Sequence, residues 1–227
     1  MSEAARLSRQ QIVETALRIA DRDGVAALTL RGVAQALSAG AMSLYRHVDG
    51  KAALLDALAE RVVAEIPLPE PGVAWRDGLR ARAMATRRVC LAHPWAAGLM
   101  EGRLASGPAR LRLQDSGLGL LMGDGFAVGP ACRALTVLDS YVYGFTLREA
   151  ALPKAEALGD AVRAVAPAIR PDDYPHIVAA MMHAMGEAEV SGVAAVMEAD
   201  FLFGLEVLLD GFGRAAGGIP HLGDAGG

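Results

Sequence analysis

The sequence LTLRGVAQALSAGAMSLYRHVDGK spans residues 28–51 and determines how the N-terminal part of the chain folds. Its apolar residues keep helical spacing within two short pieces, and Ser38-Ala39-Gly40 interrupts the pattern between them. The apolar positions are Leu30, Val33, Ala34 and Leu37 in the first piece, and Leu44 and Val48 in the second. Two short helices joined by a tight turn predict a helix-turn-helix that binds DNA.

Among the residues of this stretch outside the predicted core, seven side chains stand out as hydrogen-bond donors. They are Thr29, Arg31, Ser43, Tyr45, Arg46, His47 and Lys51. Phosphate oxygens only accept hydrogen bonds, so these side chains are suited to a DNA backbone. Thr29 is expected to cap a helix N-terminus, where free amides also bind phosphate. Lys51 falls in the first turn of the next helix, where a cation is unfavourable unless an anion lies close by.

The chain resembles the tetracycline-repressor (TetR-like) family of bacterial regulators. The resemblance rests on Leu28-Thr29-Leu30-Arg31, Leu44-Tyr45-Arg46-His47-Val48 and Lys51 followed by Ala53-Leu54-Leu55. It covers residues 8–66 well, and the remainder loosely through Ala92-His93-Pro94 and the helical segment 203–211. It implies an N-terminal three-helix DNA-binding domain followed by a C-terminal helical domain that binds a ligand and dimerises.

The resemblance also assigns roles within the helix-turn-helix. Tyr45, His47 and Lys51 match the positions that contact phosphates, and Ala41, Met42 and Ser43 match those that meet base edges. None of these last three gives a bidentate base contact, so specificity is expected to depend on Arg31, Arg46 and DNA shape. Ser38-Ala39 replaces the family's usual Gly-Val-like turn, and a serine in a left-handed turn is strained.

Composition and charge agree with a DNA-binding head on a helical body. The 227 residues include 53% apolar residues, but no apolar run spans a bilayer and no leader precedes the first helix. We therefore expect a soluble cytoplasmic protein. The net charge is −4, yet residues 1–51 hold seven basic and five acidic side chains. The head is therefore mildly cationic and the remainder acidic, which favours one docking face for a polyanion.

Helical periodicity predicts an all-α chain without strands. Ser8 and Gln11 have capping-box spacing at the start of the first helix, which ends near Gly24. Further helices are expected at 75–92, 95–101, 108–124, 130–151, 174–186 and 192–213, with a short one between 152 and 173. We predict four segments: a DNA-binding domain (1–51), a connecting helix (52–66), a ligand-binding and dimerisation domain (67–214) and a flexible tail (215–227).

Two helices of the predicted body carry more apolar surface than one face of a helix can bury. Residues 131–147 are apolar on nearly all sides, and the last helix offers Phe201, Leu205, Leu208 and Phe212 among others. Pairing both helices with their copies would form a four-helix interface, as the resemblance implies. Alternatively, both helices serve the core of a single chain.

The resemblance further implies an inducer pocket among the body helices. Methionine and aromatic side chains suit a sizeable, mostly apolar ligand, although the same residues at helical spacing also build ordinary cores. The candidate lining residues are Trp95, Leu99, Met100, Leu121, Met122, Tyr141, Tyr143, Phe145, Met181, Met182 and Met185. His176 and His183 lie too far apart to bind one metal by themselves, so we expect no metal site. The metal-chelating residues of the tetracycline-responsive members have no clear match in this chain, so the resemblance does not imply a tetracycline–magnesium inducer.

No catalytic motif supports an enzyme, and no cofactor is expected: the chain lacks a phosphate-binding glycine loop, a nucleophile elbow and a zinc motif. Cys90 and Cys132 are expected to be reduced core thiols. The sequence therefore predicts a homodimeric repressor that binds a palindromic operator and releases it when an inducer binds. The alternative is a helical protein-interaction module whose DNA binding has degenerated.

Overall fold

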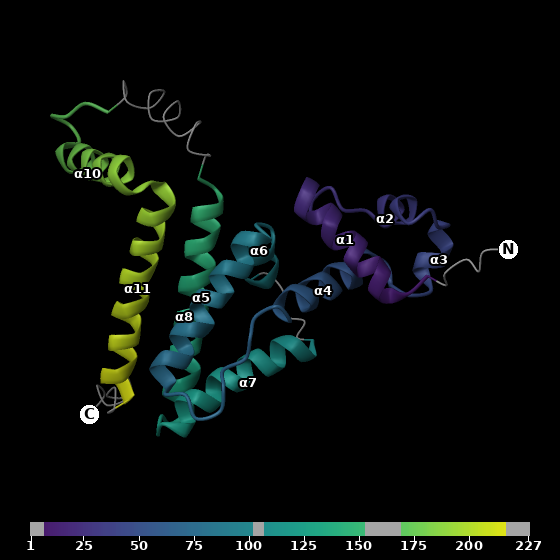
Figure 1. Ribbon diagram of the computed structural model, residues 1–227, viewed down its shortest axis with the longest axis horizontal. Helices are drawn as coiled ribbons and strands as arrows, with labels where there is room; N and C mark the ends of the chain where they lie inside the picture. Colours follow the sequence, from purple (N-terminus) through teal and green to yellow (C-terminus); the bar gives the residue numbers. More distant parts are fainter. Residues whose placement is uncertain (1–6, 102–106, 153–168, 217–227) are drawn as a thin grey trace, which may run out of the picture.

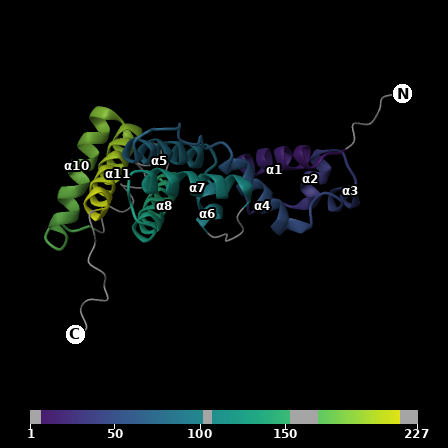
Figure 2. The same ribbon diagram turned by 90° about the horizontal axis from the view of Figure 1, so that it is seen from below.

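The computed structural model describes residues 7–101, 107–152 and 169–216, and all of their regular structure is helical (Figure 1). The all-α prediction is confirmed, because the described residues contain no strand. The short helix expected after residue 152 and the tail from residue 217 fall outside the described residues. Four helices form an N-terminal head, and the remaining helices form a body beside it (Figures 1 and 2).

The head consists of α1 (Arg9–Asp23), α2 (Leu30–Ala36), α3 (Ala41–Tyr45) and α4 (Gly50–Val63). The predicted capping box is confirmed: the Ser8 hydroxyl accepts from the Gln11 amide at 3.1 Å, and the Ser8 amide donates to the Gln11 side chain at 2.9 Å. Gly24 follows α1 with a φ of 80°, a conformation that glycine adopts without steric cost. Both ends of α1 were therefore predictable from local residues.

One apolar cluster runs from the head through α4 into the body. Ile12, Leu28 and Leu44 are fully buried in the head, and Leu58 and Val62 of α4 are buried with them. The same cluster continues with Val89, Cys90, Ala96, Ala97, Met100, Leu113 and Tyr143 of the body. Helix α4 thus joins head and body through a shared core.

The body consists of α5 (Trp75–Ala92), α6 (Ala96–Glu101), α7 (Pro108–Gly123), α8 (Val128–Ala150), α10 (Pro175–Ser191) and α11 (Val193–Ala216). Helices α5, α7 and α11 pack around α8, and their second apolar cluster includes Leu79, Leu138, Phe201, Leu205 and Leu209. Helix α10 lies against α11 at the end of the molecule opposite the head (Figure 2). Within the described ranges, no helix is both long and apolar enough to cross a membrane.

The two cysteines occupy different environments. Cys90 is buried in α5, and burial raises the pKa of its thiol to about 11. Cys132 lies exposed on α8. The prediction of two core thiols is therefore correct for Cys90 and wrong for Cys132, because the apolar neighbours of Cys132 along the chain do not cover its side of α8.

Candidate nucleic-acid interface

The turn between α2 and α3 is built by a side-chain cap and a strained residue. Thr29 precedes α2, and its hydroxyl accepts a hydrogen bond from the Gly32 amide at 3.0 Å. Ser38 has a φ of 51°, the left-handed conformation expected from its place in the turn. The amide of Ala39 donates back to the carbonyl of Ala34 at 2.9 Å, which closes the turn. Helix α3 therefore leaves α2 at a fixed angle.

Helix α3 is anchored by one side and presents the other to solvent. Leu44 is fully buried and Val48, just beyond the helix, is 4% exposed. On the outer side Met42 is 80% exposed and Tyr45 52% exposed. Ala41, Arg46 and His47 are also exposed, and Ser43 is half-buried. All the residues predicted to meet base edges are thus accessible from outside the head.

Two more residues predicted to contact DNA flank α3. Arg31 is exposed on α2, and Lys51 is exposed in the first turn of α4. The Lys51 ammonium donates to the carbonyl of Ala26 at 3.4 Å, and Asp49 does not cap the helix with its side chain. The first turn of α4 contains no acidic residue, so its positive dipole end and the ammonium lie together. This combination favours an anion at the start of α4.

A polar network joins the head to the body. The His93 ring, after the last turn of α5, lies between two carboxylates: Nδ1 is 2.8 Å from Asp21 and Nε2 is 3.2 Å from Glu65. The indole N–H of Trp95 donates to the same Asp21 oxygen at 2.8 Å. Arg61 of α4 bonds Glu65 at 2.6 Å and Glu14 of α1 at 2.7 Å. Helix α1 is therefore bonded to α4 through Glu14 and to the body through Asp21.

The structure distributes the predicted inducer residues over separate places. Trp95, Met100 and Tyr143 pack in the cluster shared by head and body, whereas Leu121, Tyr141 and Phe145 belong to the second body cluster with Phe201. Leu99 is half-buried and Met122 is 45% exposed. Met181 is half-buried on α10, where Met182 and Met185 are 71% and 56% exposed. The structure thus places these residues in two apolar clusters and on α10, and their role in binding an inducer stays a prediction.

Sequence reasoning missed two buried ion pairs in the body. Arg82 of α5, with 2% of its side chain exposed, binds Asp139 of α8 at 2.7 Å, and Gln114 of α7 donates to Asp139 at 2.7 Å. Arg87 binds Glu149 at 2.6 Å, and its guanidinium lies over the Phe201 ring. Burial, followed by the nearby Asp139 charge, raises the pKa of Tyr143. No spacing in the sequence indicates these long-range pairs.

Apolar side chains remain exposed on α8, α10 and α11. Phe203 and Val207 are 74% and 52% exposed on α11, Val137 is 44% exposed on α8, and Val190 is 87% exposed on α10. In the described part of the chain α10 has no buried residue. The apolar surface noted in the sequence is therefore only partly covered within one chain.

His176 and His183 both lie exposed on α10, and His183 is 3.5 Å from Glu187. Among the residues that the structure describes, no group of three or more His, Cys, Asp or Glu side chains could hold a metal ion.

Comparison with known proteins supplies the family. Residues 12–58 match the profile of bacterial regulatory proteins of the tetR family, and residues 68–215 match that of the tetracyclin repressor-like C-terminal domain. An HTH-type transcriptional regulator of Saccharopolyspora erythraea is 39% identical over 139 residues, which are 61% of this chain and 59% of that protein. The HTH-type transcriptional repressor DrrR1 of Streptomyces coeruleorubidus is 35% identical over 140 residues, which are 61% of this chain and 52% of DrrR1. The matched stretch thus spans between half and three fifths of these relatives.

A solved structure is similar over nearly the whole chain. The TetR family protein ActR of Streptomyces coelicolor, in complex with actinorhodin, aligns with a TM-score of 0.77 and 27% identity, covering 94% of this chain and 99% of ActR. The two profiles together account for the head and the body described above. The chain belongs to the tetR family of bacterial regulatory proteins and carries a tetracycline repressor-like C-terminal domain.

Proposed function

We propose that this chain is a ligand-responsive repressor that binds a palindromic DNA operator as a homodimer and is released by a small, mostly apolar inducer. The observation that carries the proposal is the outer side of α3, where Met42 and Tyr45 stand exposed while Leu44 anchors the helix. Such a helix can enter a major groove without any change of its own packing. The repressor DrrR1 and the ligand complex of ActR support the two halves of the proposal.

The proposed DNA contacts fall into two groups: contacts to phosphates, which position the protein on the duplex, and contacts to base edges, which recognise its sequence. Thr29, Tyr45, His47 and Lys51 would bind phosphates, because each places a donor at the rim of α2, α3 or α4. Ala41, Met42 and Ser43 would meet base edges, with Arg31 and Arg46 adding charge at the groove walls. A dimer would place its two α3 helices in successive major grooves, about 34–36 Å apart along the duplex.

Dimerisation through α8 and α11 would cover the apolar side chains that one chain leaves exposed. Phe203 and Val207 lie on the opposite side of α11 from the buried Phe201, Leu205 and Leu209. Exposed apolar surface of this kind marks an interaction site, and a two-fold axis would pair it with itself. The dimer would thus fix the separation of the two heads.

An inducer bound among the body helices would favour a dimer whose heads no longer match the operator. The residues proposed to contact it are Trp95, Leu99, Met100, Met122, Tyr141, Tyr143, Phe145, Met181, Met182 and Met185. Only a ligand that binds the operator-matching and the non-matching dimer with unequal affinity can shift the equilibrium between them. A coupling free energy of about 1–3 kcal/mol weakens operator binding by about five- to 150-fold. The hydrogen bonds of Asp21 and Glu65 to the body provide a path for that coupling.

Selection from random DNA duplexes tests the proposal against the interaction-module alternative. We expect the purified chain to enrich an inverted repeat whose half-sites lie about one helical turn, or a multiple of it, apart. Enrichment of a single unrepeated half-site would contradict binding as a dimer. Recovery of no motif at all would favour the protein-interaction module.

Replacement of Lys51 tests the phosphate contact. Lys51→Ala is expected to weaken binding to every duplex by a similar factor and to reduce the slope of log K against log salt by about one unit. Fluorescence anisotropy at several salt concentrations measures both quantities. The matched control is Arg88→Ala, which removes an exposed cation from α5 and should leave the slope unchanged. An unchanged slope for Lys51→Ala would remove this lysine from the phosphate contacts.

A further inference from the structure

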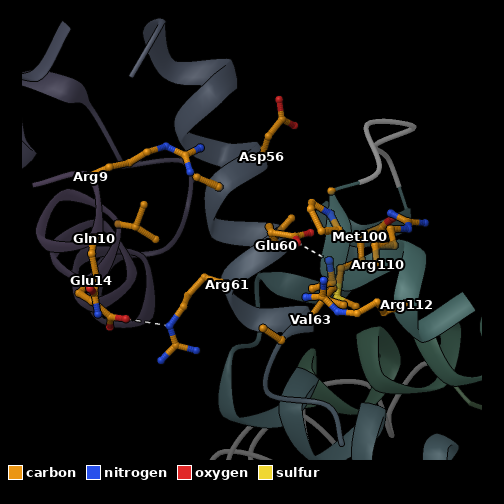
Figure 3. A pocket seen from close by; sticks show the side chains of 17 residues that line it. Arg9, Gln10, Glu14, Asp56, Glu60, Arg61, Val63, Met100, Arg110 and Arg112 are labelled. Atoms are coloured by element: carbon orange, nitrogen blue, oxygen red, sulfur yellow. Dashed lines mark hydrogen bonds and ion pairs between the residues drawn. The ribbon is translucent and has the colours of Figure 1, made fainter. Parts of the chain in front are cut away.

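A cavity of about 680 Å³ lies where the head meets the body. Figure 3 shows its lining: Arg9 and Glu14 come from α1, Glu60 and Arg61 from α4, and Arg110 and Arg112 from α7. Its volume falls within the range of about 300–1,000 Å³ that is common for small-molecule sites. None of the predicted inducer residues except Met100 lines it.

The cavity has an apolar floor. Val13, Val63, Met100 and Ala109 all line it, and each of them is between 1% and 7% exposed. These side chains come from α1, α4, α6 and α7, so the floor belongs to head and body together. An apolar molecule placed there would bury its surface against four helices at once.

The charges around the cavity differ in how they are compensated. Arg61 is held by Glu14 and Glu65, and the Glu60 carboxylate accepts a hydrogen bond from the Ala109 amide at the start of α7. Arg9 and Arg112 make no ion pair with any residue that the structure describes. They come from opposite walls, α1 and α7 (Figure 3). The lining therefore offers two guanidinium groups that remain available to an anion.

We propose that this cavity is a ligand site for a small amphipathic anion, with an apolar ring or aliphatic body on the floor and one carboxylate or sulfonate between Arg9 and Arg112. Of the inducer residues placed in the body, the site includes only Met100. Its occupant would contact both α1 and α7, and so would fix the head relative to the body. This regulatory consequence rests on the proposed DNA-binding function, whereas the binding itself does not.

Two fluorescent probes of the same shape test the site on the full chain without DNA. Anilinonaphthalene sulfonate carries the anionic group, and N-phenylnaphthylamine lacks it. We expect the anionic probe to bind the wild-type chain and to lose affinity by about fivefold in Arg9→Gln and in Arg112→Gln. Binding of the uncharged probe should stay the same in both variants. The control Arg88→Gln removes an equal charge outside the cavity and should change neither probe.

A variant that fills the cavity locates the binding. Ala59 lines the cavity and is half-buried on α4, so Ala59→Trp is expected to remove one bound anionic probe per chain while far-ultraviolet circular dichroism stays unchanged. Ala81→Trp on the exposed side of α5 is the matched control and should retain that probe. Equal binding of the anionic probe to wild type, Ala59→Trp and both arginine variants would overturn the proposal. A probe that binds as expected but leaves operator affinity unchanged would overturn only its regulatory consequence.

Discussion

The double variant Phe203→Glu, Val207→Glu is expected to be monomeric and to bind the palindromic operator about 10²- to 10⁴-fold more weakly than the wild type. Both side chains are more than half exposed on α11, so the fold of each chain should survive. Four carboxylates brought together across a two-fold axis would repel one another and would have to lose their hydration. In a dimer, the second head binds its half-site at high effective concentration once the first head has bound. A monomer lacks this second head. Light scattering and anisotropy titration measure the two effects.

The control for this variant is Leu68→Glu. Leu68 is 46% exposed in the segment between α4 and α5, and its replacement adds a carboxylate outside α8 and α11. It should remain dimeric and bind the operator like the wild type. If the α11 double variant also stays dimeric, the interface lies elsewhere on the chain.

Arg82→Ala is expected to lower the free energy of unfolding by about 3–5 kcal/mol. Removing the guanidinium leaves Asp139 largely buried, with only the Gln114 amide as a described partner. An uncompensated charge in the interior costs far more than the ion pair itself contributes. Urea unfolding followed by circular dichroism at fixed protein concentration measures the loss. Replacing both partners, as Arg82→Met with Asp139→Leu, should recover most of it, because no charge is then left buried.

Arg80→Ala is the matched control on the same helix. Arg80 pairs with Glu206 of α11 while 44% and 34% of the two side chains remain exposed, so its removal should cost less than about 1 kcal/mol. Equal losses for Arg80→Ala and Arg82→Ala would show that burial does not set the cost of these pairs.

The parts of the fold that were predictable from sequence are those that depend on neighbouring residues. Ser8 with Gln11, Thr29 before α2 and Ser38 in the turn act within three or four residues, and their geometry in the structure agrees with the prediction. The exposed outer side of α3 follows from helical periodicity once Leu44 is placed in the core. For these features the local sequence carries all the information that is needed.

The parts that were not predictable join residues far apart in the chain. His93 meets Asp21, 72 positions earlier, and Arg82 meets Asp139, 57 positions later, so neither contact leaves a periodic signal. The inducer residues stay a prediction for a related reason: methionines and aromatics at helical spacing fit a core, a pocket or an exposed helix equally well. The junction cavity was not foreseen either, since it forms only when α1, α4 and α7 are brought together.

The apolar cluster that continues from α1 through α4 to Tyr143 bears on how such proteins can be recombined. Cutting the chain after residue 66 would expose Val62, Val63 and Ile66, which are buried in the cluster that head and body share. A chimera that joins this head to a foreign body would therefore need α6 and α7, which pack against α4, as part of the transferred segment. Under the proposed function, new DNA specificities are then easier to reach by changing the exposed residues of α3 than by exchanging whole domains.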